Sequence, residues 1–261
     1  HDKWGALEGL TKLVEHVEPE LVLMENVYEI QAHQVYEDFV DTLEDFGYYL
    51  NPPENRKVYC PKYGIPQKRK RTVVLASKSG HIRLKDPSHS EEEYPTVKET
   101  IDDLPEIEAG EIHDEDPLHR CQGLEELNME RIEISEPGGT WEDWIEKGRE
   151  DLLAACHEKE SGKSYKAPYS RMKGDEPAPT ITTQFYNYGS GRFGHYDTDQ
   201  NRALSLREGA MLQTFPRDYS FIEDEEEVSV AKIGRWIGNA VPPKLAEIIG
   251  ESIVRHLEWI N

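Results

Sequence analysis

The sequence has few cysteines and no long apolar run. Its three cysteines, Cys60, Cys121 and Cys156, form no CxxC pair and no even set, so they indicate neither a zinc site nor a disulfide framework. No apolar run approaches the roughly 20 residues of a membrane span, and no signal-peptide pattern opens the chain. We therefore expect a cytoplasmic protein with reduced thiols, no metal site and no membrane partner.

Basic residues are also few in comparison with acidic ones. Acidic residues outnumber Lys and Arg by 52 to 30, which gives a formal net charge of -22, and only 36% of residues are hydrophobic. So negative a chain repels DNA at long range, because nonspecific binding depends on Lys and Arg neutralising phosphates. The bases are unevenly placed, however, since seven Lys or Arg and no acid lie from Arg56 to Arg71. Because high salt screens self-repulsion, the composition also indicates a halophilic source.

The first 78 residues show the alternating helix and strand signals of an α/β protein. Apolar residues at helical spacing predict a first helix, and Gly47 is placed to end a second one. The continuous apolar run Leu21–Met24 is typical of a buried parallel strand. The expected elements are helices at residues 5–16 and 32–46 and strands at residues 21–24, 48–50 and 71–76.

The alternating helix and strand signals end near Lys78, and regular helix signals return near residue 202. The stretch between them is acidic, with scattered Pro and Gly and short apolar clusters, which indicates a separate, irregular small domain. Helices are expected again at Leu206–Leu212 and Pro243–Trp259, where an apolar stripe repeats at helical spacing. We therefore divide the chain into the ranges 1–78, 79–201 and 202–261.

Glu25 and Asn26 directly follow the predicted strand 21–24. Ligands of open α/β sheets bind beyond the carboxyl ends of the strands, so this carboxyl is a candidate acid. A partly desolvated Glu with a raised pKa could protonate or hydrogen-bond a substrate ring nitrogen. A helix cap or a surface group is the alternative interpretation, and the residues alone leave both open.

The run Gln67–Arg71 concentrates positive charge at the start of the predicted strand 71–76. Side chains alternate in a strand, so Arg69 and Arg71 share one face while Lys68 and Lys70 take the other. One face could approach the base and phosphate of a nucleotide flipped out of a duplex. Positive charge that protects an edge strand from pairing is the alternative.

Two further segments are first of all local structure. Ser205 and Glu208 have the spacing of a capping box at the start of the helix 206–212, which makes this segment scaffold on physical grounds. Gly238–Pro243 indicates a tight turn before the final helix, with proline in its first turn. The Asn239 side chain and exposed amides of this turn could hold a small polar ligand, or the turn could serve only to start the helix.

Taken in order and with their spacing, these segments resemble the later motifs of the DNA cytosine-5 methyltransferase family, over nearly the whole chain. The fold that the resemblance implies is α/β. It consists of a partial doubly wound, Rossmann-like S-adenosylmethionine methyltransferase sheet and a small, irregular, mostly β target-recognition domain at residues 79–201. The segments that carry the resemblance are Met24–Val27, Gln67–Arg71, Pro95–Val97, Asp103–Pro105, Pro137–Trp141, Pro179–Thr183, Gly191–His195, Arg202–Pro216 and Gly238–Pro243.

The resemblance also implies an activity and a set of site residues. The activity is transfer of a methyl group from S-adenosylmethionine to C5 of a flipped cytosine in duplex DNA, as in restriction-modification systems. Glu25 would contact cytosine N3, with Asn26 bracing its loop. The implied residues are Glu25, Asn26, Arg69 and Arg71 for catalysis, Asn239 and Ala240 for S-adenosylmethionine, and Gln67, Thr180, Thr182 and Arg192 for double-stranded DNA.

The sequence departs from the family pattern in its first residues. The family's Gly-rich cofactor loop and its Pro-Cys nucleophile precede the Glu-Asn-Val motif, but only 24 residues precede Glu25 here. Asp2–Leu7 resembles the stretch just after the nucleophile loop. Cys60 lies far from the nucleophile position, and an unactivated thiol is inert. We therefore expect that this chain alone does not methylate DNA.

The same departure predicts a structural gap. Strand 21–24 would lack its parallel neighbour and present an open apolar edge, which should pair with another strand. The partner would be the N-terminal half of the catalytic domain, on the same or a separate polypeptide, or a second copy of this chain. Two other functions stay open at this point, a non-catalytic DNA-binding or regulatory relic of the family and an unrelated acidic α/β interaction protein.

Overall fold

The computed structural model describes residues 4–160, 164–222 and 229–260, which form two compact units. Unit 1 contains the chain up to Tyr63, residues 69–88 and the chain from Lys244 onward, and unit 2 contains residues 64–68 and 89–243. These boundaries differ from the predicted ranges 1–78, 79–201 and 202–261. Most of the last range packs in unit 2, and only its final helix packs in unit 1.

Unit 1 is a small sheet with helices, and its predicted elements are largely confirmed. Gly47 adopts a φ of +80° just after the second helix, as expected for a glycine that ends a helix. Short 3-10 helices occupy Tyr28–Ala32, Pro53–Arg56 and Cys60–Tyr63. The main elements are helices α1 (Gly5–Val17), α2 (Gln34–Asp45) and α9 (Pro243–Ile260) and strands β1 (Leu21–Val27), β2 (Tyr49–Leu50), β3 (Lys57–Tyr59) and β4 (Lys70–Ser77).

Every strand pair of this sheet is antiparallel, which corrects the predicted parallel strand at residues 21–24. β4 is the central strand, with β1 on one side and β2 and β3 on the other. An apolar run indicates burial but does not specify the direction of the neighbouring strand. The central place of β4 also excludes the alternative that Gln67–Arg71 protects an edge strand.

β1 forms the edge of the sheet in the described part of the chain. It pairs with β4 from Leu21 opposite Ser77 to Val27 opposite Arg71, and no described strand pairs with its other side. Leu23 is 45% exposed although it lies in the middle of this strand. The expected open apolar edge is therefore present.

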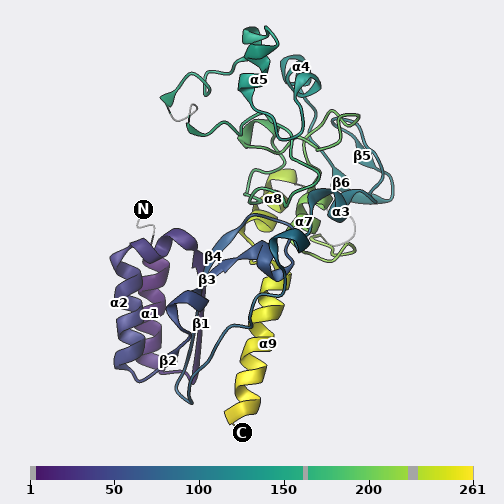
Figure 1. The fold of residues 1–261 in the computed structure, drawn as a ribbon. Coiled ribbons are helices and arrows are strands. Elements are labelled where there is room, and N and C mark those ends of the chain that lie inside the picture. The colour runs from purple at the N-terminus through teal and green to yellow at the C-terminus, as the bar shows by residue number, and fades with distance from the viewer. Residues whose placement is uncertain (1–3, 161–163, 223–228, 261) are drawn as a thin grey trace. The chain divides into compact units, whose positions relative to one another are not determined.

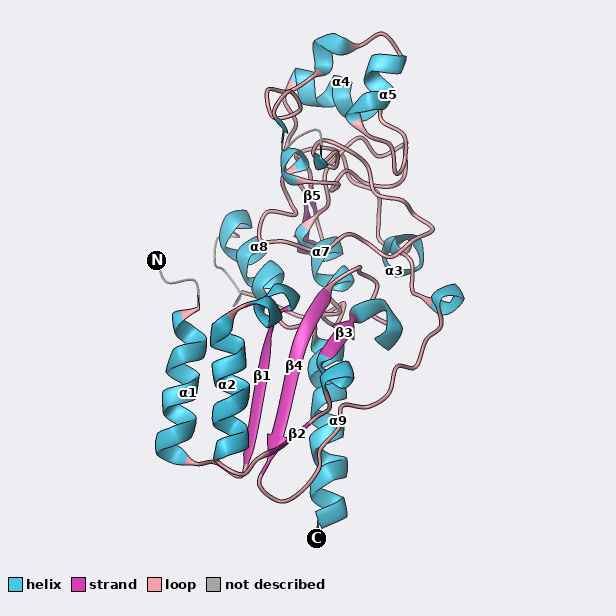
Figure 2. Cartoon of the chain, turned by 60° about the vertical axis from the view of Figure 1, so that its left-hand side comes forward, coloured by secondary structure: helices cyan, strands magenta, loops and turns pink. Residues whose placement is uncertain are grey.

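Helices lie on both sides of this sheet (Figures 1 and 2). α1 and α2 pack on the face that presents Val22, Met24, Val74 and Ala76. α9 runs along the other side, where His256 Nε2 lies 2.7 Å from Ser77 Oγ. No helix in the described ranges, α9 included, is long and apolar enough to cross a membrane.

Unit 2 has more helix than strand among its described residues, so the prediction of a mostly β domain at residues 79–201 is wrong. Its strands are two short neighbours that pair antiparallel. Short 3-10 helices lie at Glu91–Glu93, Glu150–Leu152 and Tyr188–Ser190. The main elements are α3 (Val97–Ile101), β5 (Ile112–His113), β6 (Asp116–Arg120), α4 (Glu126–Ile134), α5 (Trp141–Glu146), α7 (Leu206–Leu212) and α8 (Val230–Asn239).

Helices α7 and α8 form the core of unit 2 together with the aromatic pair Phe185 and Tyr186. Gly209 on α7 makes the close approach possible, because a Cβ at this position would lie 2.0 Å from the Phe185 ring. α8 was not predicted. Its last turn contains Gly238 and Asn239, so these residues end a helix rather than form the predicted tight turn.

A fully buried arginine holds the irregular segments of unit 2 together. The Arg171 guanidinium donates hydrogen bonds of 2.9–3.2 Å to five main-chain carbonyl oxygens and a further one to the Asn201 side chain. Burial lowers its pKa from the usual value for arginine, and no carboxylate in the described part of the chain bonds to it. The five carbonyls belong to Ile132, Ser135, His195, Asp197 and Gln200.

Candidate functional site

Glu25 and Arg71 form an ion pair on one face of the unit 1 sheet. Arg71 lies opposite Val27 in the β1–β4 ladder, two residues along β1 from Glu25, so the two side chains are diagonal neighbours on the same face. Arg71 Nε lies 2.8 Å from Glu25 Oε1, and both side chains are less than one-fifth exposed. Glu25 is thus part of a strand, which excludes its interpretation as a helix cap.

Arg69 and Cys60 lie beside this pair. Arg69 is 3% exposed, and its main-chain carbonyl accepts a hydrogen bond from the Cys60 N–H at 2.9 Å. Burial, reinforced by the charge of Arg71, lowers the pKa of Arg69 to about 10. Lys68 and Lys70 are exposed, so the predicted alternation of the basic run is confirmed.

Burial has the largest effect on the pKa of Glu25. It raises the pKa of Glu25, although the charges of Arg71 and Arg69 act in the opposite direction. Glu25 Oε1 is hidden from solvent, and apart from the Arg71 contact it has no well-aligned hydrogen bond. A carboxyl with a raised pKa stays protonated to higher pH than an exposed Glu and can donate that proton to a base placed beside it.

Two neighbouring groups have simpler roles. The Asn26 side chain accepts a hydrogen bond from the Val27 N–H at 2.8 Å, so it fixes the backbone just after Glu25. Burial raises the pKa of the fully buried Cys60 thiol to about 12. A thiol that stays protonated at neutral pH is a poor nucleophile.

The predicted DNA contact of Gln67 is inconsistent with its position in unit 2. Gln67 is fully buried, and its amide nitrogen donates to the Leu212 carbonyl at 3.0 Å and to Gln213 Oε1. Its amide oxygen accepts from the Ile181 N–H at 3.3 Å. Sequence reasoning missed this because a polar residue in a basic run was expected to face solvent.

The other predicted DNA residues lie near the surface of unit 2. Thr182 is exposed, and the hydroxyl of the half-buried Thr180 donates to the Lys68 carbonyl. Arg192 donates to the Gly139 carbonyl at 2.6 Å and lines a hollow of about 340 Å³. The hollow also contains Lys68 and Lys173, which both pair with Glu176.

The predicted cofactor residues lie at the end of α8. The Asn239 side chain is exposed and makes no hydrogen bond to the described residues. The Ala240 carbonyl accepts a 2.6 Å hydrogen bond from Gln213 Nε2. Gln213 is fully buried and was missed as a site residue. The available signal was an amide side chain between apolar residues at the end of α7.

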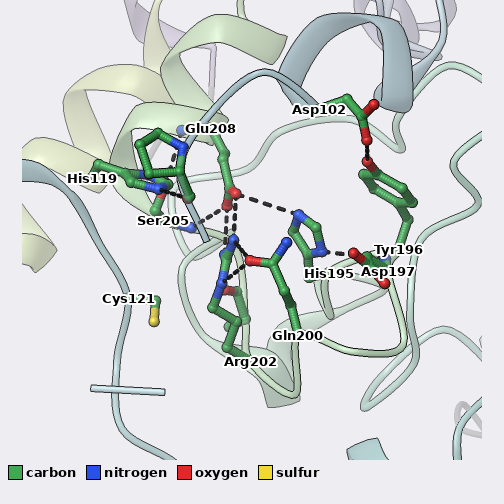
Figure 3. A network of polar contacts seen from close by, with 12 residues as sticks. Asp102, His119, Cys121, His195, Tyr196, Asp197, Gln200, Arg202, Ser205 and Glu208 are labelled. Atoms are coloured by element: carbon green, nitrogen blue, oxygen red, sulfur yellow. Dashed lines mark hydrogen bonds and ion pairs between the residues drawn. The ribbon is translucent and has the colours of Figure 1, made fainter. Parts of the chain in front are cut away.

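A second buried ion pair organises the segment 195–208 of unit 2 (Figure 3). Glu208 accepts hydrogen bonds from both terminal nitrogens of Arg202, at 2.7 and 2.8 Å, and from the Ser205 N–H at 2.7 Å. Burial alone would raise the pKa of Glu208, but Arg202 and His195 hold it well below its usual range. The Ser205–Glu208 capping box is confirmed, and the segment is scaffold, as predicted.

The comparison with protein families identifies one match. The family described as C-5 cytosine-specific DNA methylase matches residues 6–255. Of the candidate residues predicted from the sequence, unit 1 contains Glu25, Asn26, Arg69 and Arg71, and unit 2 contains Gln67, Thr180, Thr182, Arg192, Asn239 and Ala240. In the described residues, no cluster of three or more His, Cys, Asp or Glu side chains could hold a metal ion.

Individual relatives agree with this match. The chain is 44% identical to the Type II methylase M.HgiDII of Herpetosiphon aurantiacus, over 99% of this chain and 71% of the relative. It is 30% identical to the Type II methyltransferase M.BbvI of Brevibacillus brevis, of which it covers 60%. A putative DNA modification methyltransferase encoded within an Escherichia coli prophage has the same fold, with a TM-score of 0.67 at 19% identity over 95% of this chain and 72% of that one.

Proposed function

Because the chain belongs to the C-5 cytosine-specific DNA methylase family, we propose that it is the base-binding and DNA-binding part of a DNA cytosine-5 methyltransferase. The observation that carries this proposal is the buried carboxyl of Glu25, with a raised pKa and Arg71 at 2.8 Å. This is an acid poised to act on a bound base, rather than a surface carboxylate.

Glu25 protonates or hydrogen-bonds N3 of the target cytosine in this proposal. Attack of a thiolate on C6 pushes negative charge into the cytosine ring, and a proton donor at N3 stabilises that charge. The raised pKa keeps a larger fraction of Glu25 protonated than an exposed Glu would have. Arg71 lies near the carbonyl oxygen of the flipped cytosine and Arg69 near the DNA backbone.

Unit 2 contributes the target-recognition surface. Thr180, Thr182 and Arg192 lie toward DNA, and the cationic hollow that Arg192 lines accepts a backbone phosphate. Lys68 and Lys173 gain a phosphate partner there in place of Glu176. Concentrating cations in one hollow lets an acidic chain bind DNA despite its net charge of -22.

S-adenosylmethionine supplies the methyl group in this reaction. The exposed amide of Asn239 fits a polar ligand of this kind, because it makes no hydrogen bond to the described residues. Its neighbour Ala240 has its carbonyl fixed by Gln213. Asn239 and Ala240 therefore form one border of the cofactor pocket.

This chain alone does not transfer the methyl group. The Cys60 thiol is buried with a pKa of about 12, and burial also raises the pKa of Cys121, so both stay protonated at neutral pH. The nucleophile is supplied by the N-terminal half of the catalytic domain, in line with relatives that extend beyond the matched region.

The N-terminal half pairs with the open edge of β1. This edge has no strand beside it in the described part of the chain, and Leu23 is 45% exposed there. An apolar edge strand without a neighbour favours pairing with another strand, because its main-chain N–H and C=O groups and its apolar side chains otherwise face water. Self-association through the same edge is the competing outcome.

The test is methyl transfer by this chain with and without a segment that carries the Pro-Cys motif. We define the complete enzyme as the chain together with that N-terminal segment. Purified chain, segment and mixture are each incubated with methyl-labelled S-adenosylmethionine and genomic DNA, and label in 5-methylcytosine is counted. Label is expected only with the mixture or with the fused protein.

Each other result has a definite meaning. Label with the chain alone would contradict the requirement for an external nucleophile. DNA binding by the mixture without label would favour the non-catalytic relic. A Glu29→Gln variant is the control for Glu25→Gln. It also removes an acid from this segment, but Glu29 is exposed and lies four residues from Glu25.

A further inference from the structure

Two buried glutamines connect the cofactor segment of unit 2 to its DNA segment. Gln67 accepts from the Ile181 N–H at 3.3 Å, and its amide nitrogen donates to Gln213 Oε1. Gln213 in turn donates to the Ala240 carbonyl at 2.6 Å. The chain of bonds runs from Ile181 through Gln67 and Gln213 to Ala240, and we call it the glutamine relay.

A direct backbone contact joins the same two segments. Gly238 packs against the peptide between Thr182 and Thr183, and a Cβ at Gly238 would lie 2.4 Å from three of its atoms. Only glycine permits this approach, because any larger residue would overlap main-chain atoms that cannot rotate away. The segments 180–183 and 238–240 are therefore in contact by both routes.

Both glutamines can make the position of the DNA segment depend on the position of the cofactor segment. Each is fully buried, and each uses its carbonyl oxygen as an acceptor and its NH₂ group as a donor. A buried amide that loses one of these partners is left unsatisfied, which costs more than the bond itself contributes. A shift of the Ala240 carbonyl therefore favours a matching shift of Gln213, Gln67 and the Ile181 amide.

We propose that Gln67 and Gln213 are positioning residues that couple cofactor binding at Asn239 and Ala240 to DNA binding at Thr180 and Thr182. This inference rests on the proposed function, which assigns the two ends of the relay to the two ligands. Neither glutamine touches a ligand itself. Their role is to make each ligand favour the segment geometry that the other one needs, so that binding is cooperative and reciprocal.

The experiment measures this cooperativity in the complete enzyme. The probe is S-adenosylhomocysteine, which occupies the cofactor site without methyl transfer, and its Kd is measured by calorimetry with and without saturating substrate DNA. The ratio of the two Kd values is the coupling factor. A coupling factor of about 5 to 150 is expected for the wild type, the usual range for linked sites.

Two variants break the relay in different ways. Gln213→Met removes the bonds to Gln67 and Ala240, so the buried Gln67 amide loses one of its partners and keeps those to Leu212 and Ile181, which also lowers stability. The double variant Gln67→Met/Gln213→Met replaces both amides by apolar side chains of similar length, so no buried side-chain amide loses a partner and the cost is confined to the main-chain groups that the amides contacted. The coupling factor is expected to fall toward 1 in both, with the Gly238 contact as the remaining link, and the Kd for S-adenosylhomocysteine alone should stay within about threefold of wild type.

Trp144→Phe is the control for a general loss of stability in unit 2. It removes the buried hydrogen bond from Trp144 Nε1 to Ser135 Oγ, of 3.0 Å, and none of the relay. Its coupling factor should equal that of wild type. Hydrogen exchange gives a second readout, because S-adenosylhomocysteine should slow exchange of the Ile181 and Thr182 amides in the wild type but not in the double variant.

The outcomes separate the two proposals. Wild-type enzyme that binds neither S-adenosylhomocysteine nor DNA would overturn the proposed function. Wild-type enzyme that binds both with a coupling factor of 1, or a folded double variant that keeps wild-type coupling, would overturn the relay and leave the proposed function standing. If Gln213→Met does not fold, the double variant decides.

Discussion

Glu25 in unit 1 and Glu208 in unit 2 are both buried carboxylates beside an arginine, yet their pKa values shift in opposite directions. Glu208 receives two hydrogen bonds from Arg202 and one from the Ser205 N–H, and its pKa is held well below the usual range. Glu25 has one ion pair, with Arg71, and burial raises its pKa. At Glu208 the charges of Arg202 and His195 and the hydrogen bonds to the carboxylate outweigh burial, whereas at Glu25 burial outweighs the charges of Arg71 and Arg69.

The difference distinguishes a carboxylate with a structural role from a carboxyl that is a candidate for acid chemistry. A fully satisfied anion such as Glu208 holds a helix start and a loop in place, and it has no reason to take up a proton. An under-satisfied carboxyl such as Glu25 is costly to keep charged, and a bound base with a ring nitrogen relieves that cost. The same pairing of residue types thus serves two purposes in one chain.

The largest expected effect is on stability, from breaking the pair in unit 2. Glu208→Gln leaves Arg202 buried without a charge partner, so unit 2 should lose about 3–5 kcal/mol of unfolding free energy. The measurement is urea unfolding followed by circular dichroism. Glu133→Gln, at an exposed position on α4, should stay within about 0.5 kcal/mol of wild type. Equal stability of the two variants would contradict the structural role of Glu208.

The next effect is on catalysis, from the pair in unit 1. Glu25→Gln removes the proton donor to N3, so turnover of the complete enzyme should fall by about 10²-fold or more, which is at least about 2.7 kcal/mol of barrier. Phosphate contacts are unchanged, so DNA affinity should stay near that of wild type. The checks are single-turnover methyl transfer and DNA titration, with Glu29→Gln as control. Unchanged turnover would remove Glu25 from the mechanism.

The pH dependence of stability should distinguish Glu25 from Glu208, because the two carboxyls are expected to contribute to the unfolding free energy in opposite pH ranges. The folded-state pKa of Glu25 is raised, so its contribution is present at low pH and is lost as pH rises through that pKa. The pKa of Glu208 is depressed, so its contribution is present above the unfolded value and is lost as pH falls through the folded one.

Unfolding free energies measured from pH 3 to 8 test this directly. The difference between wild type and Glu25→Gln should decline with rising pH, and the difference between wild type and Glu208→Gln should decline with falling pH. Each slope is limited to about 1.4 kcal/mol per pH unit for one proton. Slopes of the same sign for both variants would refute the distinction between the two pairs.

The smallest effect concerns the thiol beside the Glu25 pair. With a pKa of about 12, Cys60 is protonated at neutral pH and takes no part in chemistry. Cys60→Ala should therefore leave turnover of the complete enzyme within about twofold of wild type. A loss as large as that of Glu25→Gln would mean that Cys60 is a nucleophile after all.

Local signals in the sequence predicted the elements well. The helical spacing of apolar residues located α1, α2 and α9, and the capping box located the start of α7. The alternation of Lys68 to Arg71 predicted which of these residues share a face. These features depend on neighbours within a few residues, which the sequence displays directly.

Features that depend on distant residues were missed. The antiparallel pairing of β1 with β4 depends on how the chain returns over some 50 residues, and an apolar run has no information on strand direction. Gln67 and Gln213 are 146 residues apart, and neither has a local reason to be buried. The arrangement of the site therefore required the structure, whereas Glu25 and Arg71 could be named from their motifs.

The way Arg171 holds unit 2 has a consequence for which substitutions the surrounding segments can accept. Five of its six acceptors are main-chain carbonyls, which every amino acid possesses. Substitutions at the end of α4, at 132–135, and in the segment 195–200 therefore keep the anchoring bonds while changing the side chains that these segments display. One buried cation can therefore anchor many different sequences in these segments, so their side chains can change without loss of the framework that carries them.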